Sequence, residues 1–75
     1  MRELIEYIAR GLVDSPDAVV VEERRDGGTT YLHLQVADGE LGRVIGRDGK
    51  LANAMRVLLR IGNRRGRRVM LDIGD

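Results

Sequence analysis

The residues best suited to chemistry form a glycine-punctuated run that reads Gly-Arg-Val-Ile-Gly-Arg-Asp-Gly-Lys over residues 42–50. Glycines beside basic residues are typical of loops that hold phosphate groups, because main-chain N–H groups approach an anion closely where no Cβ intervenes. A Walker A loop would need glycine at position 44 and Ser or Thr at position 51, where the chain has Val44 and Leu51. A dinucleotide-binding fingerprint also needs glycine at position 44, directly after a strand. The remaining interpretation is a Gly-x-x-Gly turn, from Gly46 to Gly49, that presses its backbone against a sugar-phosphate chain.

The distribution of charge also favours a polyanionic partner. Residues 1–40 carry four Arg against nine Asp or Glu, whereas residues 41–68 carry eight Arg and one Lys against Asp48 alone. Such a positive block, in a chain of net charge +1, favours phosphate contacts that release condensed counterions. A solvated arginine-rich helix face is the alternative, because exposed charge needs no partner. The arginines around Gly66 either extend this surface or end a helix favourably through its dipole; they are Arg64, Arg65, Arg67 and Arg68.

The composition argues against most catalytic and metal sites. The 75 residues include no Cys and a single His, which excludes or nearly excludes a zinc finger, a disulfide framework and a Ser/His/Asp site. His33 is expected to be a solvated strand residue, and Glu22 and Glu23 point to opposite faces of a strand, so they form no acid/base pair. We therefore expect a protein that is not an enzyme and uses no metal or cofactor. No apolar run has the length of a membrane span, so a soluble cytoplasmic protein is expected.

Hydrophobic periodicity predicts the elements that position the glycine turn. The predicted helices cover residues 2–13, 39–45 and 50–63, and the predicted strands cover residues 18–25, 29–37 and 67–73. The later strands alternate apolar and polar side chains, so helices should cover one sheet face only. The turn Asp26-Gly27-Gly28 should join the first two strands as a hairpin. We therefore predict one α+β domain over residues 1–75, with the order αββααβ, a three-stranded sheet and three helices on one face.

Details of the helices follow from the same patterns. Asp38 is the expected N-cap of the helix at 39–45, and Asp48 would cap the next helix if the glycine turn were only structural. The last helix is predicted to bury a central stripe made of Leu51, Ala54, Met55, Leu58 and Gly62. The polar side chains predicted opposite this stripe are Asn53, Arg56, Arg60 and Arg64.

In this αββααβ setting, the chain resembles a KH domain of type II topology through the run Val44-Ile45-Gly46-Arg47-Asp48-Gly49-Lys50. The resemblance spans essentially the whole chain, and the small size makes it similar to the bacterial single-KH RNA-binding proteins of the KhpA family. It implies a single-stranded RNA-binding protein, acting as a post-transcriptional regulator or RNA chaperone. By resemblance the clamp on the RNA backbone is formed by Gly46, Arg47, Asp48 and Gly49. The resemblance also implies an apolar groove floor formed by Val44, Ile45 and Leu51. It implies two further phosphate contacts, from Arg43 and Lys50.

Two features temper the expected affinity and sequence preference. The second variable position of the clamp is acidic here, where the family often has a basic or neutral residue, so Asp48 should weaken phosphate binding. Only two aromatic residues are present, Tyr7 and Tyr31, so an aromatic stacking platform is not expected.

The last predicted helix also suggests association with another protein. Val57, Leu59 and Ile61 flank its stripe, so its apolar arc covers about 200°. The first helix is one candidate to cover it, and a partner is the other. The resemblance to the KhpA family implies a homodimer, a heterodimer with a larger Jag-type KH protein, or both. The second hypothesis for function is therefore a dimerisation module with incidental RNA contact.

Overall fold

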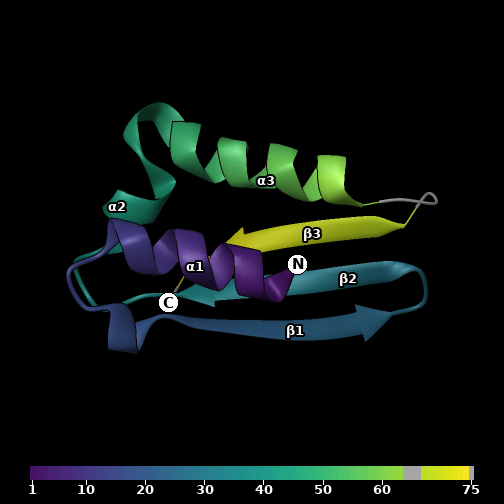
Figure 1. Ribbon diagram of the computed structural model, residues 1–75, viewed down its shortest axis with the longest axis horizontal. Coiled ribbons are helices and arrows are strands. Elements are labelled where there is room, and N and C mark those ends of the chain that lie inside the picture. The colour runs from purple at the N-terminus through teal and green to yellow at the C-terminus, as the bar shows by residue number, and fades with distance from the viewer. Residues whose placement is uncertain (64–66, 75) are drawn as a thin grey trace.

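The computed structural model describes residues 1–63 and 67–74. Its elements are α1 (Arg2–Leu12), β1 (Val20–Asp26), β2 (Thr29–Gln35), α2 (Leu41–Ile45), α3 (Lys50–Gly62) and β3 (Arg68–Ile73) (Figure 1). Two short 3-10 turns, η1 (Pro16–Ala18) and η2 (Arg47–Gly49), lie between them. The predicted αββααβ order is confirmed. The predicted basic loop at residues 64–66 lies outside the described residues.

The sheet is mixed, in the order β1-β2-β3. Strands β1 and β2 form an antiparallel hairpin that pairs Asp26 with Thr29, and Gly27 makes the turn with φ +61. Strand β3 pairs with β2 in parallel. Because side chains alternate along a strand, Leu32 and Leu34 of β2 share one face and His33 lies on the other.

The helices cover only the apolar face of this sheet, as predicted. The buried cluster includes residues from all three α-helices and all three strands: Ile5, Ala9, Val19, Val21, Leu32, Leu34, Val44, Met55, Leu59 and Leu71. On the opposite face His33 is partly exposed, and its Nδ1 lies 2.8 Å from Asp72 Oδ2. Within residues 1–63 and 67–74, no helix is both long and apolar enough to cross a membrane.

Helix α2 begins later than the sequence predicted. Gly39 has φ +84, and Glu40 rather than Asp38 is the residue that precedes the helix. The buried Glu40 carboxylate accepts a hydrogen bond from the N–H of Asp14 at 2.6 Å, which ties this segment to the end of α1. The prediction of an Asp38 cap is therefore wrong, because a long-range contact fixes the chain before α2.

Helix α3 buries a different stripe from the predicted one. Its buried side chains are Ala52, Met55 and Leu59. Four of the five predicted stripe residues are exposed instead: Leu51, Ala54, Leu58 and Gly62. Because α3 is apolar over a wide arc, its periodicity alone does not fix which side meets the sheet. The result leaves part of the apolar arc on the surface.

Candidate nucleic-acid interface

The Gly-x-x-Gly run forms an exposed bend between α2 and α3, hereafter the bend (residues 46–49). Gly46 ends α2 by donating its N–H to the carbonyl of Gly42 at 2.9 Å, and η2 then leads directly into α3. Arg47 and Asp48 at the tip of the bend are exposed, as is Lys50 at the start of α3. The bend is therefore accessible to a ligand.

The two glycines of the bend serve different purposes. Gly46 and Gly49 have φ +78 and +76. A Cβ at Gly46 would lie 2.8 Å from Leu51 Cγ and 3.0 Å from the Leu51 main-chain nitrogen. A Cβ at Gly49 would approach only Asn53, whose Nδ2 lies 4.0 Å away. Close packing within the protein thus explains Gly46, whereas the open space before Gly49 fits close approach by a ligand.

Asp48 does not cap α3, contrary to the structural alternative considered for the turn. Gly49 occupies the N-cap position, and no described side chain forms a capping hydrogen bond there. Asp48 itself has φ +56, a left-handed conformation that aspartate tolerates better than most residues. Its carboxylate therefore lies at the exposed tip of the bend. The Lys50 N–H donates to the carbonyl of Arg47, and the positive end of the α3 dipole, with no described side chain capping it, faces the exposed bend.

The other predicted contact residues differ in their exposure. Val44 is 0% exposed and belongs to the core, so the prediction that it lines a ligand groove is wrong; it anchors the bend instead. Ile45 is half-buried, and Leu51 is 37% exposed beside the bend. Arg43 is exposed, but its Nη2 lies 3.1 Å from Asp14 Oδ2. Exposed ion pairs of this kind are weak, so Arg43 can exchange Asp14 for a phosphate at small cost.

A polar stripe runs along α3 away from the bend and consists of Lys50, Asn53, Arg56 and Arg60. Spacings of three and four residues place these exposed side chains on one face of the helix. Strand β3 lies beside α3 (Figure 1). Between them is a groove of about 470 Å³, lined by Arg56, Arg60, Arg67, Arg68, Val69, Met70 and Leu71.

The sequence predicted Asn53, Arg56 and Arg60 on this face but not the groove; Arg64, which was also predicted there, lies outside the described residues. The stripe follows from local helical spacing, whereas the groove also needs β3, which meets Arg56 at Leu71, 15 residues further along the chain. The only signal for it in the sequence was the alternation of the last strand, which places Met70 on the face opposite Val69 and Leu71.

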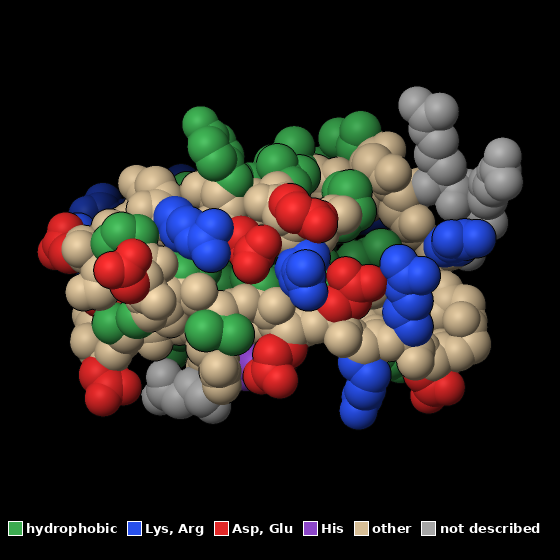
Figure 2. All heavy atoms as spheres, turned by 60° about the horizontal axis from the view of Figure 1, so that its bottom comes forward, with side chains coloured by type: hydrophobic (Ala, Val, Ile, Leu, Met, Phe, Trp, Pro, Cys, Tyr) green, Lys and Arg blue, Asp and Glu red, His purple; other side chains and the backbone are tan. Residues whose placement is uncertain are grey.

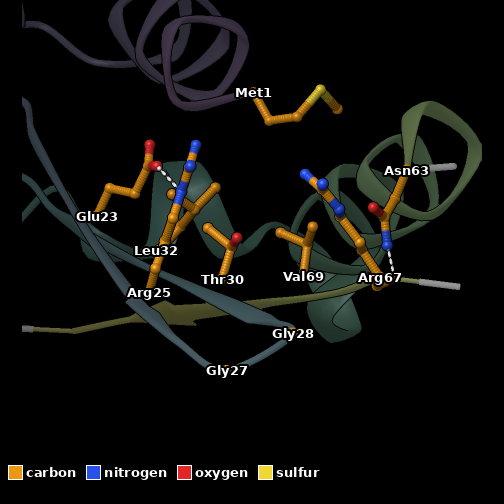
Figure 3. A pocket seen from close by; sticks show the side chains of 10 residues that line it. All are labelled: Met1, Glu23, Arg25, Gly27, Gly28, Thr30, Leu32, Asn63, Arg67 and Val69. Carbon is orange, nitrogen blue, oxygen red and sulfur yellow. Dashed lines mark hydrogen bonds and ion pairs between the residues drawn. The ribbon is translucent and has the colours of Figure 1, made fainter. Parts of the chain in front are cut away.

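A second hollow, of about 460 Å³, lies beside the β1–β2 turn (Figure 3), at the opposite end of the sheet from the bend (Figure 1). Met1, the hairpin turn and Asn63 border it, and Arg25 in its wall is paired with Glu23 at 3.1 Å. None of residues 43–51 lines this hollow, whereas Arg67 lines both this hollow and the groove between α3 and β3. It therefore adds nothing to the interface at the bend.

The surface around β1 contrasts with the polar stripe. On this side of the molecule, acidic and basic side chains are intermixed (Figure 2). Hydrophobic side chains gather along the helical side of the same view. The exposed large apolar residues of α1 and α3 are Leu4, Tyr7, Leu51, Val57, Leu58 and Ile61. The described cations are thus not concentrated on the β1 side.

The αββααβ order, the mixed three-stranded sheet and the exposed Gly-x-x-Gly bend between the last two helices define a domain of the KH type. Comparison with known families agrees: residues 2–73 match the family model described as "KhpA/KhpB, KH domain". The chain belongs to the KhpA/KhpB family of KH domains.

Named relatives give the same assignment. The chain is 43% identical to the RNA-binding protein KhpA of Halalkalibacterium halodurans, over the full length of both chains. It is 40% identical to the RNA-binding protein KhpA of Aquifex aeolicus, over 97% of this chain and 94% of the relative. The RNA-binding protein KhpA of Treponema pallidum is 49% identical over 76% of this chain and 71% of its own length. No solved structure matches the chain.

Proposed function

We propose that the protein binds single-stranded RNA in the bacterial cytoplasm, as one KH domain over residues 1–75, and acts as a post-transcriptional regulator or RNA chaperone. The observation that carries this proposal is the exposed bend, with a start of α3 that no described side chain caps and with Arg47 and Lys50 beside it. The relatives named RNA-binding protein KhpA support the same function.

The proposed contacts divide into two groups. Phosphates would meet the main chain of the bend, the positive end of the α3 dipole, and the cations of Arg47 and Lys50. Bases would lie beside Ile45 and Leu51 and along the groove between α3 and β3, where apolar and hydrogen-bonding contacts replace aromatic stacking. From Lys50 to Arg60 the polar stripe extends about 15 Å along the helix axis. This length suits a short single-stranded segment, and KH domains clamp about four nucleotides.

Charge reversal at the tip of the bend tests this proposal. Arg47→Asp should leave the far-UV circular dichroism unchanged, because Arg47 is exposed, and should weaken RNA binding at least tenfold. If one phosphate contact is lost, the slope of log affinity against log salt should also fall by about 0.7. Arg2→Asp, with the same charge change at the far end of α1, is the matched control and should bind RNA almost as the wild type does (Figure 1). Retained binding by a folded Arg47→Asp variant would refute the clamp.

An apolar surface on α3, which no described residue covers, supports a second function. Leu58 is 43% exposed and Ile61 is 73% exposed, both on a helix whose opposite side is in the core. We propose that a second copy of the chain, or a larger Jag-type KH protein, covers this face. A homodimer would place two bends on one RNA and raise avidity through effective concentration.

Sedimentation with and without RNA separates the two functions. Leu58→Glu should convert a dimer to a folded monomer, and RNA affinity should then fall without loss of the salt dependence. If the wild type associates tightly but shows no salt-dependent retention of RNA, the dimerisation module is favoured and the RNA-binding function is refuted. A monomeric wild type at micromolar concentration would refute the homodimer.

A further inference from the structure

Arg56 is held in a defined orientation in the groove between α3 and β3. Its Nε and Nη2 donate to the carbonyl of Leu71, at 3.4 and 3.2 Å, and its Nη1 donates to Asn53 Oδ1 at 3.4 Å. A guanidinium has five N–H donors, so these bonds leave one N–H on each terminal nitrogen. Arg56 therefore offers two donors to a ligand in the groove from a group that is already positioned.

The edge of β3 determines what surrounds these donors. The N–H groups of Arg68 and Gly74 donate to carbonyls of the hairpin turn and of β2, at 3.2 and 3.1 Å. Because main-chain groups alternate sides along a strand, the N–H and carbonyl of Leu71 point away from β2, toward α3. The bond from Arg56 to the Leu71 carbonyl agrees with this direction. Since Arg56 takes that carbonyl, the groups of this edge nearest to the guanidinium are donors, and the next outward-pointing carbonyls belong to Val69 and Ile73, two residues away along the strand.

We propose that Arg56 makes this groove select guanine over adenine in bound RNA, an inference that rests on the proposed RNA-binding function. Guanine presents the adjacent acceptors O6 and N7, which an arginine with two free N–H groups can satisfy together. Adenine presents the N6 amino group in place of O6, so at this position a donor would face donors. Burying a donor without an acceptor costs free energy, so adenine should bind at this position more weakly than guanine.

The competing explanation is that Arg56 only fastens β3 to α3. Arg56→Lys separates the two roles because it keeps the positive charge but loses the planar fork of donors. Arg60→Lys is the matched control: it makes the same change one turn along the polar stripe, at a residue that also lines the groove. The probes are unstructured octamers of uridine with a single central guanosine, adenosine or 7-deazaguanosine, which lacks the N7 acceptor. Binding is measured by fluorescence anisotropy.

The wild type should bind the guanosine octamer about tenfold more tightly than the adenosine octamer, a size typical of one bidentate contact. The 7-deazaguanosine octamer should lose several-fold of that advantage. In Arg56→Lys the ratio should fall to about twofold or less, because the affinity for the guanosine octamer should fall more than the affinity for the adenosine octamer. Arg60→Lys should keep the wild-type ratio.

Three results would overturn the inference. If the wild type binds the guanosine and adenosine octamers equally well, the proposed function stays intact but there is no guanine preference. An unchanged ratio in Arg56→Lys assigns the preference to another group. An equal loss of affinity for every octamer, together with a lower melting temperature, means that Arg56 is only a structural link. Failure of the wild type to bind any octamer is distinguishable from these, because it refutes the proposed function itself and this inference with it.

Discussion

The glycines around the bend lead to a prediction in which three similar substitutions have three different outcomes. Gly46→Ala should destabilise the protein strongly, Gly49→Ala moderately and Gly42→Ala not at all. The difference arises because Gly46 has a positive φ and close neighbours, and Gly49 has only the positive φ. Gly42 lies within α2, and a Cβ added there would meet no atom within 4 Å beyond its chain neighbours and the backbone of its own helix.

The expected magnitudes follow from these geometries. Gly46 has φ 78 and ψ 173, a region populated almost only by glycine, where another residue costs about 1–3 kcal/mol. The overlap with Leu51 includes its main-chain nitrogen, which a change of rotamer cannot move, and adds about 1–3 kcal/mol. Gly49 has φ 76 and ψ 14, where alanine costs about 1–2 kcal/mol with no overlap. Alanine at Gly42 should stabilise α2 by about 0.5 kcal/mol.

Urea unfolding followed by far-UV circular dichroism measures these differences. A domain of this size has a free energy of unfolding of about 4–11 kcal/mol, so a loss of about 3 kcal/mol at Gly46 leaves a measurable transition. With a slope of about 1 kcal/mol/M, the midpoint should fall by about 3 M for Gly46→Ala and about 1 M for Gly49→Ala. Equal losses in the two variants, or a Gly46→Ala protein as stable as the wild type, would refute the assignment of Gly46 to internal packing.

Two further predictions concern buried contacts and use the same measurement. Leu59→Ala should lower the free energy of unfolding by about 2–5 kcal/mol, because Leu59 is in the core. Leu58→Ala, on the exposed side of α3, should change monomer stability by less than about 1 kcal/mol. Similar losses in the two variants would contradict the orientation of α3. Glu40→Leu should cost about 1–3 kcal/mol because it leaves the Asp14 N–H without its acceptor, and Glu40→Gln, which keeps an acceptor oxygen, should cost less than half as much. If the two Glu40 variants are equally stable, the hydrogen bond to Asp14 does not stabilise this segment.

The elements of the fold could be predicted from local patterns. The alternation of Leu32 and Leu34 with His33 identified β2, and its two faces lie as predicted. The spacing of Ile5 and Ala9 identified α1, which buries both residues. These patterns act over a few residues, so the sequence alone carries them.

The remaining features depend on contacts between distant segments. The wide apolar arc of α3 allowed several orientations, and packing on the sheet selected the side with Met55 rather than Leu58. Glu40 reads as a helix residue in the sequence but is held by Asp14, 26 residues away. The position of Arg56 against Leu71 requires β3 to dock, which no local pattern reports.

Strand β3 has a consequence for the order in which the molecule is assembled. It pairs with β2 across 39 residues, as between His33 and Asp72. Contacts over such separations form late, because the intervening chain must first be ordered. One wall of the groove therefore exists only after β3 has docked. A nucleic acid lying there would oppose the departure of that strand, so occupancy should slow amide hydrogen exchange in β3 more than in the hairpin.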